Sequence, residues 1–550
     1  MTDNRAAAIV LAAGKGTRMK TDLPKVMQPI GGRPMINYLL DHLRPLGCNP
    51  VTVVVAPGMD SVAKAVAPHK TAIQGEQKGT AHAALCARPA LGGFTGDVLI
   101  LYGDCPFITT ATIRRLLERR RAADKPAVVV LGFRPGDPAQ YGRLILGANG
   151  GLESIVEYAD ATEAQRQIRL CNSGVMAVDG KALFALLDRV GNDNAKREYY
   201  LVDIVALARR DGASCAVVEA PAEELLGINS RAELAVAEAV MQERLRLAAM
   251  ANGTTLIDPG SVFLSWDTKL GRDVVIEPHV IFGPGVTVGD GVEIKAFCHI
   301  EGARIERGAR IGPYARLRPG SAIGENAHIG NFVETKNARV GKGAKANHLT
   351  YLGDAAVGAA SNIGAGTITA NYDGFGKYHT EIGAGVSIGS NVVLRAPVKV
   401  GDGAIVGAGS VIVRDVPRDA LAVARGTQTE RPGWAAKFRE YKSAQKAAEQ
   451  NTNGKGPRPV TVTIRKSDGT VVSTHQAKAA KPAPKVRAVV TVQKPQRQVA
   501  APVKEPAPKA AKAKAGSAPK KMAAKAKSSP SAASGASGKK PQSAAKKGKR

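Results

Sequence analysis

One stretch of the sequence, from Leu264 to Ile412, carries large apolar residues at a spacing of six. Eighteen positions follow this spacing, with one step of five and one interruption, and ten of them are followed directly by glycine. They are Leu264, Leu270, Ile276, Phe282, Val288, Ile294, Ile300, Ile305, Ile311, Leu317, Ile323, Ile329, Ile382, Ile388, Leu394, Val400, Val406 and Ile412. A helix repeats every 3.6 residues and a strand every two, so neither element alone has this period.

A period of six predicts a parallel β-helix, in which three short strands make one triangular coil and each strand points one large side chain inward. Coils of about 18 residues that stack at about 4.8 Å give about eight coils and a prism about 40 Å long. We expect the glycines at the corners, because glycine takes positive φ without a steric penalty. Val416 and Pro417 are expected to end the prism, and residues 367–381, where the period stops, are expected to form a protruding loop.

The net charge of +30 is unevenly distributed over the 550 residues. Residues 451–550 contain 24 lysines and arginines and two acidic residues, whereas residues 1–450 are nearly balanced. This tail has too few large apolar side chains for a core, so it should be disordered, apart from an isolated hairpin between Pro459 and Thr474. Its Lys, Ala and Pro run resembles linker-histone tails and suits nucleic acid or another polyanion, bound without sequence preference. A solubilising appendage is the alternative.

The six cysteines are scattered without a CxxC pair, which argues for a reducing compartment and against structural zinc. The first residues show no signal peptide, and no apolar run reaches membrane-spanning length. These features predict a cytoplasmic protein that does not insert into a membrane.

In the first half, apolar strands lead into polar loops. Ala6–Leu11 runs into a glycine-rich segment that contains Gly14 and Arg18 and is followed by Lys25. Backbone N–H groups of such loops approach phosphates, although a plain glycine turn is the alternative because the Rossmann and P-loop patterns are incomplete. Asp104 follows another apolar strand, at the end where open α/β sheets bind ligands.

Alternating strands and helices through residue 230 predict an α/β doubly wound sheet. Ser230 and Glu233 then form a capping-box signature, which predicts the start of a helix. Apolar residues at Leu234, Met241 and Leu245 fall on one face of this helix, so we expect it to join the sheet domain to the prism.

The strings from Leu11 to Lys25, Tyr141-Gly142-Arg143 and Cys171-Asn172-Ser173-Gly174 resemble the sugar nucleotidyltransferases, although Ser173 replaces the usual threonine. The resemblance implies that UTP and the sugar contact Leu11, Gly14, Arg18, Lys25, Gln74, Gly79, Thr80, Tyr102, Gly142, Glu157, Asn172 and Asn229. It also implies a Mg²⁺ held by Asp104 and Asn229, as suits a reaction between two phosphates. His82 is expected to be structural and not catalytic.

In the second half, His348 to Asp354, Ile363 to Thr367 and Asn371 to Gly374 resemble the acetyltransferase half of the bifunctional bacterial enzyme of UDP-N-acetylglucosamine synthesis. By this resemblance the prism is left-handed and His348 is the general base, a role that suits an imidazole at neutral pH. Glucosamine 1-phosphate would contact Arg318, Lys336, Tyr351, Asn362 and Lys377. Acetyl-CoA would contact Ala365, Asn371, Tyr372, Ser390, Ala408 and Arg425.

The whole resemblance implies a homotrimeric enzyme that acetylates glucosamine 1-phosphate and then transfers a uridylyl group from UTP to the product. The alternative is a monofunctional sugar-1-phosphate nucleotidyltransferase whose β-helix is only structural. A nucleic-acid-binding protein is disfavoured, because the basic excess is confined to the tail. The predicted parts are a nucleotidyltransferase domain (1–229), a connecting helix (230–252), a β-helix acetyltransferase domain (253–420), an arm (421–450) and a basic tail (451–550).

Overall fold

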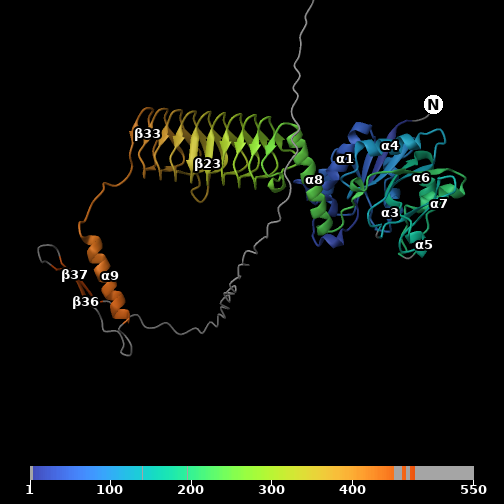
Figure 1. Cartoon of the computed structure of the whole chain (residues 1–550), viewed down its shortest axis with the longest axis horizontal. Coiled ribbons are helices and arrows are strands. Elements are labelled where there is room, and N and C mark those ends of the chain that lie inside the picture. The colour runs from blue at the N-terminus through green and yellow to red at the C-terminus, as the bar shows by residue number, and fades with distance from the viewer. Residues whose placement is uncertain (1–3, 139, 195, 451–460, 466–470, 477–550) are drawn as a thin grey trace, which may run out of the picture. The chain divides into compact units, whose positions relative to one another are not determined.

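The computed structural model describes residues 4–138, 140–194, 196–450, 461–465 and 471–476 (Figure 1). The described residues divide into two units, one that ends at Thr429 and one that begins at Glu430. The first unit contains a sheet domain followed by a β-helix.

The sheet domain is built on one mixed sheet. Its main path has the order β11-β7-β10-β6-β1-β4-β5, and β10 runs antiparallel to β6 and β7 while the other pairs are parallel. A hairpin of β8 and β9 joins it at β10, and β2 and β3 form a separate hairpin. The strands are β1 (Ala6–Leu11), β2 (Pro29–Ile30), β3 (Arg33–Pro34), β4 (Val51–Val55), β5 (Lys70–Ile73), β6 (Asp97–Tyr102), β7 (Val128–Phe133), β8 (Arg143–Leu146), β9 (Leu152–Val156), β10 (Cys171–Asp179) and β11 (Cys215–Glu219).

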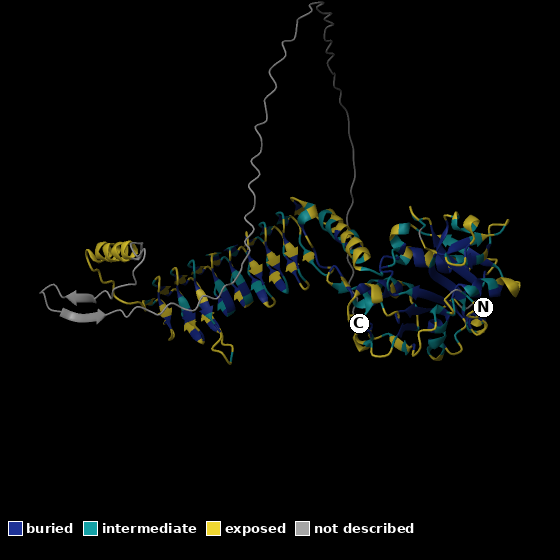
Figure 2. Cartoon of the chain, turned by 90° about the horizontal axis from the view of Figure 1, so that it is seen from below, coloured by how far each residue is buried: buried dark blue, intermediate teal, exposed yellow. Residues whose placement is uncertain are grey.

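Helices cover both faces of this sheet (Figure 2). The central strands β1, β4, β6, β7 and β10 are almost wholly buried, whereas the edge strand β5 is largely exposed. One core contains side chains of α3, α6 and α7, and the other contains side chains of α1, α2 and α4. The helices of the domain are α1 (Met35–Leu43), α2 (Asp60–Ala65), α3 (Thr80–Cys86), α4 (Thr110–Arg120), α5 (Glu163–Arg166), α6 (Gly180–Leu187) and α7 (Asp203–Arg210). The predicted doubly wound α/β class is confirmed, with β10 as the antiparallel exception.

Helix α8 (Arg231–Ala251) links the sheet domain to the β-helix. The predicted capping box is present: Ser230 accepts from the Glu233 backbone, and Glu233 accepts from the Ser230 backbone at 2.8 Å. Farther along the helix, the buried side-chain amide of Gln242 donates to Leu264 O at 2.7 Å and accepts from Leu264 N at 2.8 Å. The helix therefore contacts the first coil through a satisfied buried amide.

Parallel strands stack along the β-helix. One sheet has ten strands in the order β12-β14-β17-β20-β23-β25-β27-β30-β33-β35, and the second contains fourteen. The ten are β12 (Thr255–Leu256), β14 (Val275–Ile276), β17 (Glu293–Ile294), β20 (Arg310–Ile311), β23 (His328–Asn331), β25 (Lys345–His348), β27 (Asn362–Ile363), β30 (Ser387–Ile388), β33 (Ile405–Val406) and β35 (Leu421–Ala422). The fourteen are β13 (Lys269–Leu270), β15 (Ile281–Phe282), β16 (Thr287–Val288), β18 (His299–Ile300), β19 (Ala303–Ile305), β21 (Arg316–Leu317), β22 (Ser321–Ile323), β24 (Glu334–Val340), β26 (Tyr351–Val357), β28 (Ile368–Ala370), β29 (Thr380–Ile382), β31 (Val393–Arg395), β32 (Val398–Val400) and β34 (Val411–Ile412).

The six-residue period predicts the interior correctly. Every predicted inward side chain except Leu270 is buried, and Leu270 packs against the same core. The interruption in the middle is shorter than predicted, because Thr335 and Thr369 continue the inward column at 0% exposure. Their hydroxyls are satisfied inside the prism, by Ser321 Oγ at 2.8 Å and by Gly353 O at 3.0 Å respectively. The protruding loop therefore begins after β28 and not at residue 367.

Two other expectations are wrong. Val416 and Pro417 do not end the prism, because β35 pairs in parallel with β33 beyond them. Most glycines that follow inward residues do not have positive φ. A Cβ at Gly289 would lie 2.7 Å from Arg307 N, and one at Gly324 would lie 2.8 Å from Gly341 C, so glycine is needed for the close approach of the next coil.

The second unit contains helix α9 (Trp434–Gln450) and the strands β36 (Thr461–Arg465) and β37 (Val471–Gln476). The two strands pair antiparallel, so the predicted hairpin is present. The rest of the predicted basic tail lies outside the described residues. Across the part of the chain that is described, we find no helix with the length and apolar character to cross a membrane.

Replacing the fully buried Ile311 by alanine should lower the free energy of unfolding by about 2–5 kcal/mol, because it removes buried methyl groups and leaves a cavity between coils. The matched control is Ile281→Ala, on a side chain that is 44% exposed, which should change stability by less than about 0.5 kcal/mol. Urea unfolding of both variants measures the difference. Equal losses would contradict an interior built from the six-residue repeat.

Candidate active sites

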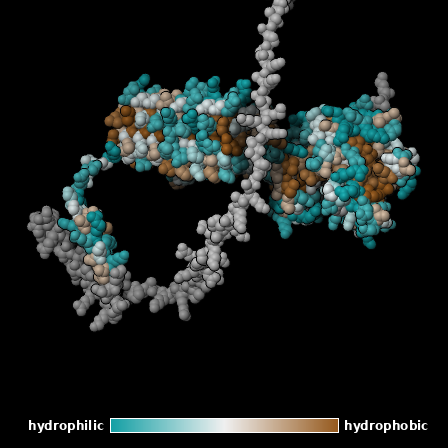
Figure 3. All heavy atoms as spheres, in the orientation of Figure 1, coloured by the Kyte–Doolittle hydropathy of each residue, from teal (hydrophilic) through white to brown (hydrophobic). Residues whose placement is uncertain are grey.

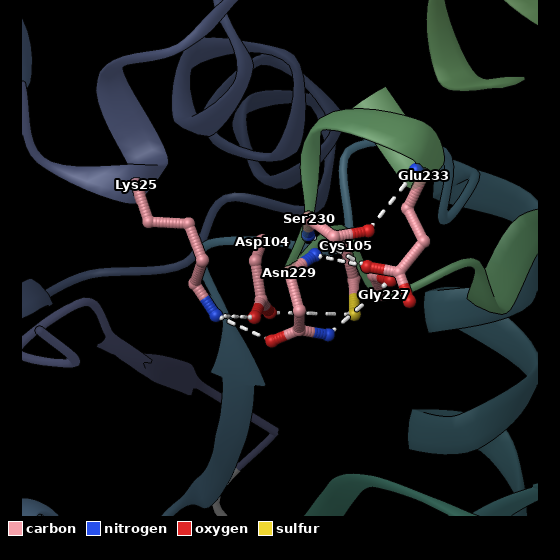
Figure 4. A network of polar contacts seen from close by, with 7 residues as sticks. All are labelled: Lys25, Asp104, Cys105, Gly227, Asn229, Ser230 and Glu233. Carbon is pink, nitrogen blue, oxygen red and sulfur yellow. Dashed lines mark hydrogen bonds and ion pairs between the residues drawn. The ribbon is translucent and has the colours of Figure 1, made fainter. Parts of the chain in front are cut away.

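Three predicted residues of the sheet domain meet at one point (Figure 4). Lys25 Nζ forms an ion pair with Asp104 and donates to Asn229 Oδ1 at 2.9 Å. The side chains of Lys25 and Asp104 are only 14% and 15% exposed. The structure thus brings two oxygen donors and one ammonium group together from segments far apart in the sequence.

Local structure positions these side chains. Lys25 begins a short 3-10 helix (Lys25–Met27), and Asp104 follows the carboxyl end of β6. The backbone of Ile228 donates to Asp104 O at 3.0 Å, and Glu233 accepts from the Asn229 backbone at 2.7 Å. The carboxylate that caps α8 therefore also fixes the backbone of Asn229.

These residues line a cavity of about 400 Å³. Nine of the predicted residues border it: Leu11, Gly14, Lys25, Gln74, Gly79, Thr80, Tyr102, Asp104 and Asn229. The sequence interpretation missed Gln77 and Glu198, which also line the cavity. Gln77 Nε2 donates to Ala13 O at 2.5 Å. The one sequence feature that could have indicated Gln77 is its position between the predicted residues Gln74 and Gly79.

The remaining predicted residues lie beside the cavity or away from it. Arg18 is exposed and does not line the cavity. Gly142 and Glu157 are neighbours, since a Cβ on Gly142 would lie 3.2 Å from Glu157 Oε1. Asn172 N donates to Gly142 O at 2.8 Å, so the three residues predicted to contact the sugar form one group. Burial raises the pKa of Glu157.

The backbone conformation at position 79 requires glycine. Gly79 has a φ of 117°, and a Cβ there would lie 2.5 Å from Tyr199 O. The segment that contains Gly79 also bonds to the segment that contains Tyr199, because Ala81 N donates to Tyr199 O at 3.0 Å. Only glycine fits this position without moving the segment that carries Glu198.

On the β-helix, His348 lies at the end of β25, where it pairs in register with Asn331 of the coil before. His348 Nδ1 lies 2.7 Å from Asn331 Oδ1. A carbonyl oxygen only accepts, so Nδ1 carries a proton, and in the neutral imidazole the lone pair is then on Nε2. The contact orients the ring and leaves a base available for proton transfer.

A cluster of cations is formed by Arg318 and Lys336, which belong to the neighbouring sheet, and by Lys377, which lies in the loop between β28 and β29. Lys336 is close to Lys377, and the positive charge of Lys377, together with that of Arg318, holds the pKa of Lys336 below its ordinary value. Arg318 also donates to Glu334 Oε1 at 2.8 Å, and Glu334 pairs in register with Tyr351. Three cations that face one another are suited to an anion such as a phosphate.

Four of the six predicted acetyl-CoA residues, Ala365, Ser390, Ala408 and Arg425, fall on one corner of successive coils. Asn391 N donates to Ala365 O at 2.7 Å, and Gly409 N donates to Ser390 O at 2.8 Å. Arg425 Nη1 reaches Ala408 O at 3.0 Å. This corner is a continuous strip of main chain and small side chains.

The loop after β28 holds the other two predicted acetyl-CoA residues. Asn371 is buried and donates to Asp354 Oδ2 at 2.5 Å, whereas Tyr372 is 62% exposed. Asn362 is not on the sheet of Tyr351, because it lies on β27 beside Lys345. The described residues of one chain therefore do not gather all the predicted sugar contacts on one face.

The fold and these two sites define a nucleotidyltransferase domain joined to a hexapeptide-repeat transferase domain. A model of the MobA-like NTP transferase domain matches residues 8–169. A model of the bacterial transferase hexapeptide (six repeats) matches residues 267–302, 302–337 and 379–414.

Similar proteins carry the name bifunctional protein GlmU. That of Paramagnetospirillum magneticum is 63% identical over 447 residues, 81% of this chain and 99% of its own length. That of Rhodospirillum rubrum is 65% identical over 437 residues, which are 80% of this chain and 98% of that protein. That of Sphingopyxis alaskensis is 56% identical over 449 residues, which are 82% of this chain and 99% of that protein. The chain belongs to the bifunctional GlmU family.

The chain is accordingly a bifunctional enzyme with acetyltransferase and uridylyltransferase activities. Membership of this family, together with the hexapeptide transferase match, rules out the alternative in which the β-helix only provides a scaffold.

Gly79→Ala should lower the rate of pyrophosphate release at least about tenfold, because a positive φ and a Cβ against Tyr199 O add strain of about 1–3 kcal/mol beside the cavity. The control is Gly75→Ala, where a Cβ would meet no atom within 4 Å. A coupled pyrophosphate assay compares the two. Equal rates for both variants would contradict the placement of Gly79 in the site.

Proposed function

We propose that the β-helix site transfers the acetyl group of acetyl-CoA to glucosamine 1-phosphate and that the sheet-domain site then joins the product to UTP. The observation that supports this most directly is the meeting of Lys25, Asp104 and Asn229 at one end of a cavity, with His348 oriented separately on the prism. UTP and acetyl-CoA are cytoplasmic metabolites, so we place the enzyme in the cytoplasm.

In uridylyl transfer, the phosphate of N-acetylglucosamine 1-phosphate attacks the α-phosphate of UTP and pyrophosphate leaves. Both groups are anionic, so cations and N–H donors are needed to bring them together. We assign Lys25 and the loop around Gly14 to the triphosphate, with Arg18 joining when the loop binds UTP. Gly142, Glu157 and Asn172 are assigned to the sugar.

Mg²⁺ fits this site, because the oxygens of Asp104 and Asn229 already converge on a cation, the ammonium of Lys25. A hard cation takes carboxylate and amide oxygens together with phosphates and water. When bound, it neutralises the charge that develops on the phosphates. Lys25 would then turn its ammonium toward the triphosphate.

In acetyl transfer, His348 Nε2 removes a proton from the 2-amino group of glucosamine 1-phosphate. The amine attacks the thioester carbon, and the thiolate of CoA leaves and takes up a proton. Arg318, Lys336 and Lys377 hold the phosphate, and Tyr351 and Asn362 contact the sugar. Acetyl-CoA lies along the corner that carries Ala365, Ser390, Ala408 and Arg425, with Asn371 and Tyr372 beside it.

We also propose that the enzyme is a homotrimer, supported by an exposed aromatic column on one corner. His279, Phe297, Tyr314 and Phe332 stack with ring centroids 4.9 to 5.1 Å apart. The column leads to Leu349, which is 61% exposed and directly follows His348. Burial of this column between copies would place the acetyl site at a subunit interface. A second copy would also explain why Asn362 lies on another sheet.

Apolar side chains also gather at the last coils of the prism, where Figure 3 shows a hydrophobic surface. Val411, Val413, Leu421 and Val423 are each at least 45% exposed there. We propose that they pack against the arm of a neighbouring copy, whose Trp434 and Phe438 are exposed as well.

Two single substitutions should separate the activities. His348→Ala removes the general base and should lower thiol release from acetyl-CoA and glucosamine 1-phosphate about 10²–10⁴-fold. Asp104→Ala removes an oxygen donor of the metal site and should lower pyrophosphate release from UTP and N-acetylglucosamine 1-phosphate at least about a hundredfold.

Each variant is the control for the other, because each should keep the activity of the unaltered site within about twofold. Loss of both activities from either substitution would contradict two independent sites.

The net charge of +22 in residues 451–550 supports an electrostatic role for the tail, which we propose binds nucleic acid or other polyanions. Deletion of 451–550 should leave both activities within about twofold of the full chain. It should also abolish retardation of duplex DNA of unrelated sequences at low salt. A large loss of either activity would show that the tail belongs to the catalytic unit.

A further inference from the structure

The amide of Gln74 is held in one orientation. Gln74 follows β5, is 4% exposed and lines the cavity of the sheet domain. Its Nε2 donates to Gly79 O at 3.1 Å and to His82 Nδ1 at 3.2 Å. Gly79 O can only accept, so it is the nitrogen end of the amide that faces it.

These two contacts engage both hydrogens of the Gln74 amide. His82 then carries its proton on Nε2, because Nδ1 accepts. Among the described residues, no contact engages Gln74 Oε1. The polar atom that Gln74 can offer to a ligand in this cavity is therefore an acceptor and not a donor.

We propose that His82 sets the base preference of the nucleotide site by holding Gln74 in this orientation. The inference rests on the proposed function, which brings UTP into the cavity, and it adds a residue and a reason for the choice of base. Uracil carries a hydrogen on N3 and donates it to Gln74 Oε1. Cytosine has a lone pair at N3, which faces the same oxygen and is repelled.

His82 is a positioning residue, because it contacts Gln74 and does not itself line the cavity. Gly79 O alone would engage one amide hydrogen and leave the second free to turn toward the base. That N–H would suit the N3 lone pair of cytosine. His82 Nδ1 accepts from this second N–H and so keeps it away from the base. A site whose polar group accepts from its ligand rejects a ligand that lacks the donor.

Equilibrium binding of UTP and CTP, measured calorimetrically with Mg²⁺ on the full chain, tests the proposal. For His82→Leu, which has no acceptor, the ratio of UTP affinity to CTP affinity should fall about tenfold. His82→Asn has a side-chain carbonyl close to the position of Nδ1, so it should restore most of the ratio. Thiol release at the β-helix, which is remote from this change, should stay at the wild-type rate in both variants.

A double-mutant cycle separates positioning from general structural damage. In a Gln74→Leu background, His82→Leu should leave the UTP to CTP ratio unchanged within about twofold, because the partner through which it acts is gone. A further fall of the ratio in that background would overturn the proposal. An equal loss of UTP and CTP affinity in His82→Leu alone would also overturn it.

The proposed function is tested separately by turnover of the wild-type chain. If it binds UTP in preference to CTP, and the variants behave as expected, but no pyrophosphate forms with N-acetylglucosamine 1-phosphate, then the role of His82 stands and the proposed sugar substrate fails. If pyrophosphate forms but UTP and CTP bind equally, the role of His82 fails and the proposed function stands.

Discussion

Main-chain hydrogen bonding between successive coils is the constraint on which the β-helix depends. Gly289 N donates to Ile305 O at 2.7 Å, and Gly401 N donates to Val416 O at 2.8 Å. Coils this close leave no space for a Cβ at such positions, because one on Gly401 would lie 2.4 Å from Arg418 N. The same stacking places His348 directly over Asn331, so the orientation of the proposed base follows from the repeat.

The start of α8 has a comparable role for the sheet domain. The Glu233 carboxylate accepts from the backbone of Asn229 and of Ser230, at 2.7 and 2.8 Å, and so caps the helix and fixes the proposed metal ligand together. Twelve residues after Ser230, Gln242 of the same helix bonds to the first coil. One helix thus connects both catalytic domains through satisfied polar contacts.

Regular spacing made the interior of the prism predictable, because each inward residue is apolar and repeats along the chain. Thr335 and Thr369 also point inward, but a pattern of apolar residues does not include them because threonine is polar. Their hydroxyls find hydrogen-bond partners only in the folded coils. Motifs located most of the nucleotide cavity, but Glu198 lies far along the sequence and reaches it only in the fold. The pairing of His82 with Gln74 likewise depends on which atoms of the two side chains meet, which spacing does not specify.

The central claim, that one chain carries two independent sites acting in sequence, is tested most directly by mixing two inactive variants. Purified Asp104→Ala and His348→Ala are combined and supplied with glucosamine 1-phosphate, acetyl-CoA, UTP and Mg²⁺, and UDP-N-acetylglucosamine is quantified. We predict that neither variant alone forms the product, whereas the mixture forms it at a rate comparable to the wild type. Failure of the mixture to form the product would contradict the claim.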